Sequence, residues 1–149
     1  GWEDVSRLSP EKQAQILPYI FDWIKTAENF SGREVYTGFA QIEAMRNALH
    51  AALNGFDFIL SPTAPTASYP AEWASPINDP QKPFEHIAFT VAANMGGQPA
   101  ISINCGYTSG GLPIGLQIIG QSFDDIGVLR LARAFETMRP EQRPWPKVA

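Results

Sequence analysis

The sequence predicts an α/β domain in which helices pack on a small mixed β-sheet that includes an antiparallel hairpin. Stretches near both ends repeat apolar residues at the three- and four-residue spacing of amphipathic helices, whereas three short apolar runs in between have the length and the glycine or proline boundaries of strands. Hydrophobic residues make up 44% of the 149 residues and charged residues 17%. This balance is typical of a globular protein, so we expect residues 1–149 to form one domain.

The first helix is expected over residues 10–28. Ser9 and Pro10 have the residue types of an N-cap and a first helical position, and the apolar residues that follow recur at helical spacing. Pro18 lies inside this stretch and lacks a backbone N–H, so we expect a kink or a break into two short helices there.

A second helix is expected to begin at Ser31, because Ser31 and Glu34 form the S-x-x-E pattern of a capping box. The pattern predicts one buried apolar stripe along this helix, which ends at Asn54-Gly55. The stripe consists of Val35, Phe39, Ile42, Met45, Leu49 and Leu53. Residues 1–55 are therefore predicted to be helical.

Residues 56–60 form a nearly continuous apolar run between Gly55 and Pro62, which predicts a central strand buried on both faces. Residues 56–65 thus form a strand followed by a Pro-Thr turn. Six prolines between positions 61 and 83 prevent long regular structure, so we expect a proline-rich loop over 66–83. A loop of this length is either functional or a simple linker.

Residues 84–139 predict a helix, a hairpin and a second helix. The first helix ends at Gly96-Gly97, and strands at 100–106 and 114–120 are joined by a flexible turn at 108–111. Asp124 is expected to cap the last helix, which precedes a tail at 140–149. Alternation along the first strand places Cys105 on its inward face.

Composition narrows the functional classes. The formal net charge is −4 and the arginines are dispersed, so nucleic acid is not an expected partner. Apolar runs fall short of the roughly 20 residues that cross a bilayer, and we expect a soluble, cytoplasmic protein without a membrane contact. A single cysteine allows no internal disulfide. The initial Gly1 is consistent with a fragment of a longer protein or with a residue left by tag removal.

Common catalytic patterns are missing or weak. The G-x-S-x-G motif of α/β-hydrolases does not occur, and a Cys105–His86 pair is disfavoured because an inward cysteine behaves as a small hydrophobe. His50 has no second ligand at i+4, so it is interpreted as a surface or boundary residue rather than a metal ligand. Asp124 and Asp125 begin a helix, where capping explains them. We expect no metal and no cofactor.

Four segments in order resemble the C-terminal third of the amidase-signature family, whose members hydrolyse or transfer amide groups. They are FDFILSPTAP at 56–65, FTVAANMGGQPAIS at 89–102, GGLPIGLQIIG at 110–120, and FDD at 123–125 with LRLARAFE at 129–136. Each segment is weak alone, and their order and spacing make the resemblance specific. It implies that the chain is the C-terminal part of the amidase-signature fold.

The resemblance also implies which catalytic groups this chain lacks. The family uses a serine nucleophile, a second serine and a lysine, which lie in an upstream glycine- and serine-rich region. This sequence has no Gly-Ser-Ser run, and none of its four lysines stands in the expected surroundings. We therefore expect the parent protein to be an amidase acting on small amides, and the 149-residue chain alone to be inactive and to contain no catalytic residue.

The chain is instead expected to form one wall of the substrate pocket. Thr63 and Pro65 follow the end of a strand, where α/β sheets commonly place ligands, although a rigid turn needed only for folding is an equal alternative. Trp73 and Phe84 are further candidates for the pocket wall, and Trp73 is also explained as a cover for the core. Asn94 is expected to bond to backbone near the end of its helix.

Three functions remain open at this stage. Family members that amidate glutamyl-tRNA resemble the chain strongly, so part of the A subunit of a glutamyl-tRNA amidotransferase is one alternative. These members carry an acidic residue that holds the amino group of the substrate, and this sequence has Ile87 at the nearest equivalent position, which favours a small-amide amidase. A noncatalytic protein-interaction domain is the third possibility. A truncated sheet would expose apolar surface, so we expect a homo-oligomer, at least a dimer, that buries the first two helices or a strand edge.

Overall fold

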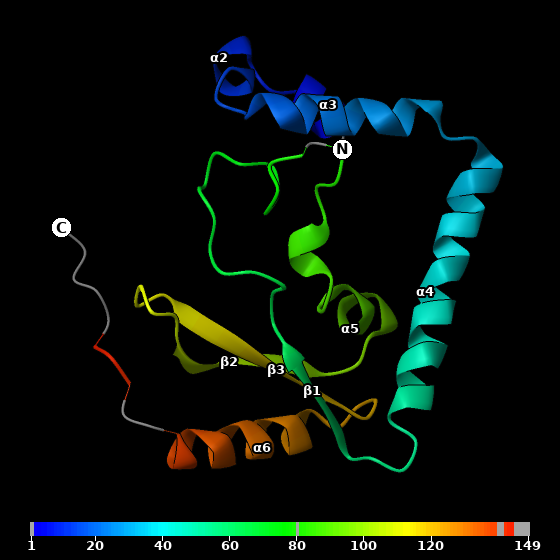
Figure 1. Cartoon of the computed structure of the whole chain (residues 1–149). Helices are drawn as coiled ribbons and strands as arrows, with labels where there is room; N and C mark the ends of the chain where they lie inside the picture. Colours follow the sequence, from blue (N-terminus) through cyan, green and yellow to red (C-terminus); the bar gives the residue numbers. More distant parts are fainter. Residues whose placement is uncertain (1, 80, 140–141, 145–149) are drawn as a thin grey trace.

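A computed structural model describes residues 2–79, 81–139 and 142–144. The α-helices are α1 (Trp2–Ser6), α2 (Pro10–Gln13), α3 (Pro18–Thr26), α4 (Gly32–Ala52), α5 (Val91–Gly96) and α6 (Asp125–Met138). Short 3-10 turns occupy η1 (Ala27–Asn29) and η2 (Glu85–Ile87), and the strands are β1 (Phe58–Pro62), β2 (Ala100–Tyr107) and β3 (Pro113–Gly120). Figure 1 shows α6 along one face of the sheet, α5 and the loops on the other, and α3 with α4 forming an arm around these loops.

Within the described residues the sheet has the order β1-β3-β2, and both strand pairs are antiparallel. The α/β class and the antiparallel hairpin are confirmed, and the hairpin strands differ from the predicted bounds by one residue at most. The prediction of a mixed sheet is wrong in this respect. The hairpin leaves one edge of β3 free, and β1 pairs with that edge in the antiparallel direction.

The prediction that residues 56–60 form a central, doubly buried strand is also wrong. β1 begins two residues later and lies at an edge of the sheet that the described strands form. Phe56 precedes the strand and is 68% exposed, and Leu60 within it is 59% exposed. A continuous apolar run therefore does not prove cover on both faces, because cover depends on elements distant in the sequence.

The N-terminal helices follow their local signals. The expected break into two short helices is confirmed: the stretch is divided into α2 and α3, and Pro18 is the first residue of α3, where its missing N–H costs no helical hydrogen bond. The capping box at α4 is confirmed: the N–H of Ser31 donates to Glu34 Oε2 at 2.8 Å, and the N–H of Glu34 donates to Ser31 Oγ at 3.3 Å.

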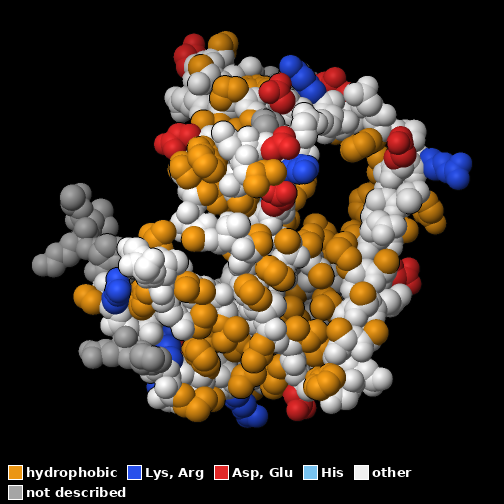
Figure 2. All heavy atoms as spheres, viewed as in Figure 1, with side chains coloured by type: hydrophobic (Ala, Val, Ile, Leu, Met, Phe, Trp, Pro, Cys, Tyr) orange, Lys and Arg blue, Asp and Glu red, His pale blue; other side chains and the backbone are white. Residues whose placement is uncertain are grey.

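The predicted buried stripe on α4 is only half correct. Leu49 and Leu53 are buried, whereas Val35 is 47% exposed and Phe39 is 69% exposed. Figure 2 shows an opening between this end of α4 and the central loops, with hydrophobic side chains at its rim. The first half of α4 extends beyond the sheet and α5, so described elements cover little of its apolar side.

The core is divided between the two faces of the sheet. On one face Ile103 and Ile118 pack against Val128 and Ala132 of α6. On the other face Ile119 packs with Leu49 of α4 and Ala93 of α5.

A β-bulge corrects the expected position of Cys105. The register pairs Asn104 with Gly115 and Gly106 with Ile114, so Cys105 is the extra residue between them. The alternation predicted an inward thiol, but the bulge turns Cys105 outward and leaves it exposed.

Two further predictions concern the helices beside the hairpin. The helix expected after residue 84 is divided into η2 and α5, and Gly97 ends it with a φ of 79°, which favours glycine. The cap of α6 is confirmed, because the N–H of Gly127 donates to Asp124 Oδ1 at 2.9 Å.

Of the predicted tail only residues 142–144 are described, and the remainder lies outside the described residues. None of the helices in the described ranges is long and apolar enough to cross a membrane.

Candidate functional site

The face of the sheet beneath α5 carries polar side chains in register. Cross-strand pairing aligns Ser61 of β1, Gln117 of β3 and Ser102 of β2 in one row. The row before it, at Ile59, Ile119 and Ala100, is apolar, and its members Ile59 and Ile119 belong to the core. The change from an apolar to a polar row marks the boundary between the core and a candidate binding surface.

A glycine in β3 permits contact across the sheet. The N–H of Thr63 donates to Gly115 O at 3.0 Å, and Thr63 Oγ1 lies 2.6 Å from Ser102 Oγ on the far strand. A Cβ at position 115 would lie 2.6 Å from Thr63 Oγ1 and 3.0 Å from Ser102 Oγ, so any larger residue would separate the two hydroxyls.

Gln117 is a fixed element of this surface. Its side chain is 4% exposed, and its Nε2 donates to Ser61 Oγ at 3.0 Å and to Phe89 O at 2.8 Å. These bonds connect β1 and the segment that precedes α5 to the middle strand, β3. Arg46 of α4 supports the same region, because its Nε donates to Gly96 O at 2.9 Å and so holds the end of α5.

One hollow is lined by Gln117 and Ser102 of this polar row, and a second lies next to it at Thr63. The sheet pocket, of about 250 Å³, lies between α5 and the sheet. Its polar lining comes from Thr63, Thr90, Asn94, Gln98, Ser102 and Gln117. The loop pocket, of about 450 Å³, is formed by residues 62–69 and 113–115 together with His86 and Thr108. Thr63 lines both hollows, which places the Pro-Thr turn at their junction.

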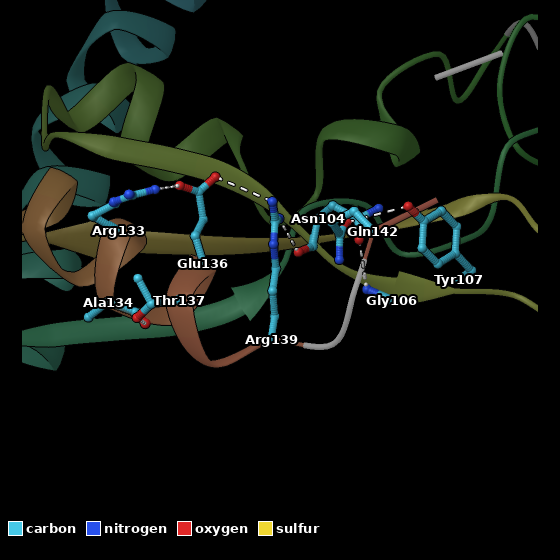
Figure 3. Close-up of polar contacts among 9 residues, drawn as sticks. All are labelled: Asn104, Gly106, Tyr107, Arg133, Ala134, Glu136, Thr137, Arg139 and Gln142. Carbon is cyan, nitrogen blue, oxygen red and sulfur yellow. Dashed lines mark hydrogen bonds and ion pairs between the residues drawn. The ribbon is translucent and has the colours of Figure 1, made fainter. Parts of the chain in front are cut away.

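Residues at and just after the end of α6 contact strand β2 of the hairpin, and Figure 3 shows Arg139 between Glu136 and Asn104. Arg139 Nη1 donates to Asn104 O at 3.0 Å and Nη2 lies 3.5 Å from Glu136 Oε1. Tyr107 receives a hydrogen bond from the N–H of Arg143 at 3.1 Å, and the guanidinium of Arg143 lies 4.8 Å from the centre of its ring. These contacts anchor β2 next to the turn that carries Thr108.

His86 is the one imidazole among the described residues that line either hollow. Its ring lies 6.5 Å from that of Tyr69, and its Nδ1 is buried without a hydrogen-bond partner in the described structure. The sequence did not identify this residue as a pocket residue, since a lone histidine in a short turn gives no distinctive pattern.

The four predicted substrate-binding residues fall into two groups. Thr63 and Pro65 line the loop pocket. Phe84 instead packs edge-on against Trp23 of α3, with ring centres 5.1 Å apart, and Trp73 is 39% exposed in the loop. Neither of these aromatic residues is among the described residues that line the two hollows. Substrate binding by all four remains a prediction.

Other candidates from the sequence have structural explanations. His50 is exposed on α4, with Nε2 3.4 Å from Ser122 Oγ. Asn94 makes the expected backbone bond, because its Nδ2 donates to Thr90 O at 2.9 Å. In the described ranges there is no group of three or more histidine, cysteine or acidic residues arranged to hold a metal ion.

Sequence reasoning missed Ser61, Ser102 and Gln117. Each is a polar residue within a strand: Ser61 and Gln117 stand in otherwise apolar strands, and Ser102 alternates with apolar residues, as Asn104 does. That signal was present in all three strands, but only the register shows that the three side chains form one row.

A family model and curated proteins of known name match this chain. The model of the family described as Amidase matches residues 3–129 of the chain. The chain is 40% identical over 104 residues to the A-type subunit of glutamyl-tRNA(Gln) amidotransferase from Thermodesulfovibrio yellowstonii, an alignment that covers 70% of this chain and 20% of that protein. The chain spans about a fifth of the length of the curated relatives it matches.

Solved structures agree with this comparison. The corresponding glutamyl-tRNA(Gln) amidotransferase protein from Thermotoga maritima superposes with a TM-score of 0.65 at 28% identity, covering 93% of this chain and 30% of that one. A bacterial aryl acylamidase of the amidase-signature family gives a TM-score of 0.71 at 23% identity over 87% of this chain and 28% of that one. The second likeness concerns the fold alone.

Proposed function

The chain belongs to the amidase family, and from this premise we propose that it forms the C-terminal part of an amide-hydrolysing enzyme and supplies one wall of its substrate pocket. The observation that carries the proposal is the polar row Ser61–Gln117–Ser102, which contributes Gln117 and Ser102 to the sheet pocket, next to a second hollow that shares Thr63 with it. A surface of this kind can position a substrate. Among the described residues that line the two hollows, the hydroxyls bond to one another and to amides and none bonds to a basic side chain, whereas hydrolysis requires a nucleophile with an adjacent base.

The proposed division of work assigns the chemistry to residues outside this sequence. In the family to which the chain belongs, a serine attacks the amide carbonyl, a second serine and a lysine transfer the proton, and backbone N–H groups stabilise the oxyanion. The C–N bond then breaks, the amine or ammonia leaves with the transferred proton as the acyl-serine ester forms, and water hydrolyses this ester to release the acid. The sequence has no Gly-Ser-Ser run to supply these groups, which supports a positioning role for this chain.

The proposal is tested by assaying the purified 149-residue chain against simple aliphatic and aromatic amides. We expect no turnover above background, because the serine–serine–lysine set is absent from the sequence. Cys105→Ala is the control, since Cys105 is the one thiol of the chain and is exposed. Turnover that survives this substitution would show that hydrolysis is carried by residues of this chain and would refute the proposal.

A second candidate is part of the A-type subunit of a glutamyl-tRNA amidotransferase. The 40% identity to the protein from Thermodesulfovibrio yellowstonii supports it. Ile87 weighs against it, because an apolar side chain cannot hold the amino group of a substrate as a carboxylate does. The two candidates differ in what a protein containing this segment would do: release ammonia or amine from small amides in water, or amidate glutamyl-tRNA with glutamine as the nitrogen donor.

A third candidate, a noncatalytic interaction domain, is supported by the exposed apolar side of α4. It is distinguished by the coding sequence that precedes Gly1. A Gly-Ser-Ser region and its lysine there would support the enzyme, and a translation start immediately before this segment would support the interaction domain.

A further inference from the structure

The turn between β3 and α6 holds a phenylalanine in a strained and exposed position. The N–H of Asp124 donates to Gln121 O at 3.0 Å, which closes a turn whose third residue is Phe123. The φ of Phe123 is 69°, in the left-handed region that glycine and asparagine favour and that is an outlier for a bulky residue. Phe123 is also 94% exposed, so packing within the described chain does not offset the cost of this conformation. Folding alone therefore does not account for a phenylalanine at this position.

A second exposed phenylalanine is held next to this turn. Gln121 Nε2 donates to Phe56 O at 3.0 Å and to Leu53 O at 3.1 Å, which ties the turn to the segment between α4 and β1. Phe56 is 68% exposed. We call Phe56 and Phe123 the phenylalanine corner. Aromatic side chains on a backbone held in this way are suited to anchor an interface, because they bury a large apolar area.

The N-terminal half of α4 offers a surface that could receive such an anchor. Phe39 lies three and four residues after Tyr36 and Val35, so the three side chains are neighbours on the helix. They are 69%, 77% and 47% exposed, respectively. Figure 2 shows hydrophobic side chains at the rim of the opening between this half of α4 and the central loops. An aromatic ring that enters there would contact apolar side chains.

The phenylalanine corner and this surface lie at opposite ends of one helix. His50 Nε2 is 3.4 Å from Ser122 Oγ, which places the corner beside the C-terminal end of α4. From Phe39 to His50 the helix rises about 16 Å at 1.5 Å per residue. When two copies of the chain lie with their α4 helices antiparallel, the corner of each copy can reach the N-terminal half of α4 in the other. Both contacts then form together, as in the self-complementary interface of a twofold dimer.

The exposed surface is large enough for this interface. The chain exposes 10861 Å², whereas monomeric proteins of this length expose about 7,500 Å². Each partner of an ordinary interface contributes about 800 Å². We propose that two copies of this chain form a twofold dimer in which Phe123 of each copy inserts beside Phe39 of the other. The sequence indicated an oligomer but gave no part in it to the turn that carries Phe123, and the dimer does not depend on the proposed hydrolytic function.

The experiment compares dissociation constants of the 149-residue chain and its variants by sedimentation velocity. Phe123→Asn removes the anchor and introduces a residue that tolerates the φ of the turn, so the urea midpoint of the monomer should not fall. Phe39→Ser alters the receiving surface at an exposed position. Each variant should raise the dissociation constant about tenfold. Met138→Ser, at a residue of α6 that is 75% exposed, is the control and should leave it unchanged.

A mixture of the two variants is the decisive measurement. In a mixed dimer the Phe39→Ser copy still has Phe123 and the Phe123→Asn copy still has Phe39, so one of the two contacts stays intact. Apart from the statistical advantage of a mixed pair, this dimer should be about threefold tighter than the dimer of either variant, because it loses one contact in place of two.

Four outcomes overturn the proposal. They are an unchanged dissociation constant in Phe123→Asn, a mixed dimer no tighter than those of the separate variants, and a monomeric unaltered chain, which would mean that a different partner covers both surfaces. The fourth is a lower urea midpoint in Phe123→Asn, which would show that Phe123 packs within its own chain. The assay for hydrolytic inactivity is unaffected by any of them.

Discussion

The α6 side of the sheet and the first half of α4 differ in how far other elements cover their apolar residues. Val128 of α6 is 3% exposed and packs in the core with Ile118. Val35 of α4, in an equally regular helical pattern, is 47% exposed. The comparison shows that periodicity determines which side of a helix is apolar, whereas the fold of distant segments determines whether that side is buried.

The total solvent-accessible surface shows how much of the chain other elements leave uncovered. Monomeric proteins of 149 residues expose about 7,500 Å², whereas this chain exposes 10861 Å². The surplus is more than twice the ~800 Å² that one partner contributes to an interface of ordinary size. The uncovered side of α4 is part of this surplus, so we expect it to associate with another surface.

The largest expected effect comes from a matched pair of substitutions in the two regions. Val128→Ala should lower the free energy of unfolding by about 2 kcal/mol, because it removes buried methyl groups and leaves a cavity. Val35→Ala should change it by no more than about 0.5 kcal/mol. Urea unfolding followed by circular dichroism, at a dilution where the chain is monomeric, measures both. Equal losses would mean that α4 is covered in solution.

Self-association is the second test of the comparison. We expect the chain to form a dimer or larger species at micromolar concentration through the exposed residues of α4. Phe39→Ser should raise the dissociation constant about tenfold, which corresponds to ~1.4 kcal/mol. Leu129→Ser, at an apolar position of α6 that is 53% exposed, is the control. Light scattering that shows a monodisperse monomer of the unaltered chain would contradict this prediction.

Removal of the caps of α6 and α4 should change the free energy of unfolding by different amounts. Asp124→Ala should lower the free energy of unfolding by about 1 kcal/mol, because α6 belongs to the core. Ser31→Ala should loosen the first turn of α4 and leave the urea midpoint unchanged, since little packs on that turn. Hydrogen exchange of residues 32–36, together with the two midpoints, measures the difference. A shift of the midpoint in Ser31→Ala would show that the turn is coupled to the core.

The smallest effect is a titration. The Ser31 hydroxyl, and after it the backbone N–H of Ser31, hold the pKa of Glu34 below its ordinary value. A lowered folded-state pKa contributes stability above the unfolded-state pKa, and this contribution is lost as pH falls through the folded-state value. Carboxyl ¹³C shifts should show that the pKa of Glu34 rises in Ser31→Ala. An unchanged pKa would mean that the hydroxyl is not its main partner.

Local signals predicted local structure well. The capping box of Ser31 and Glu34, the stop at Gly97 and the cap at Asp124 each depend on residues within one turn, and all three are confirmed. The hairpin strands were predicted to within one residue for the same reason.

The errors depend on contacts between distant segments. The edge position of β1 and the exposure of Phe39 depend on which segments pack there, and the outward Cys105 results from a register shift against β3. The site follows the same rule. Thr63 could be selected from its place after a strand, whereas the alignment of Ser102 with Gln117 required the pairing of strands.

We expect the bulge at Cys105 to limit aggregation as well. β2 has an unpaired outer side within the described sheet, and such a side can recruit strands from other molecules and begin fibrillar growth. The extra residue interrupts the regular run of N–H and C=O groups after Asn104, so that an added strand could stay in register only along the first part of β2. A chain with this much uncovered apolar surface thus carries, in one inserted residue, a local barrier to ordered polymerisation.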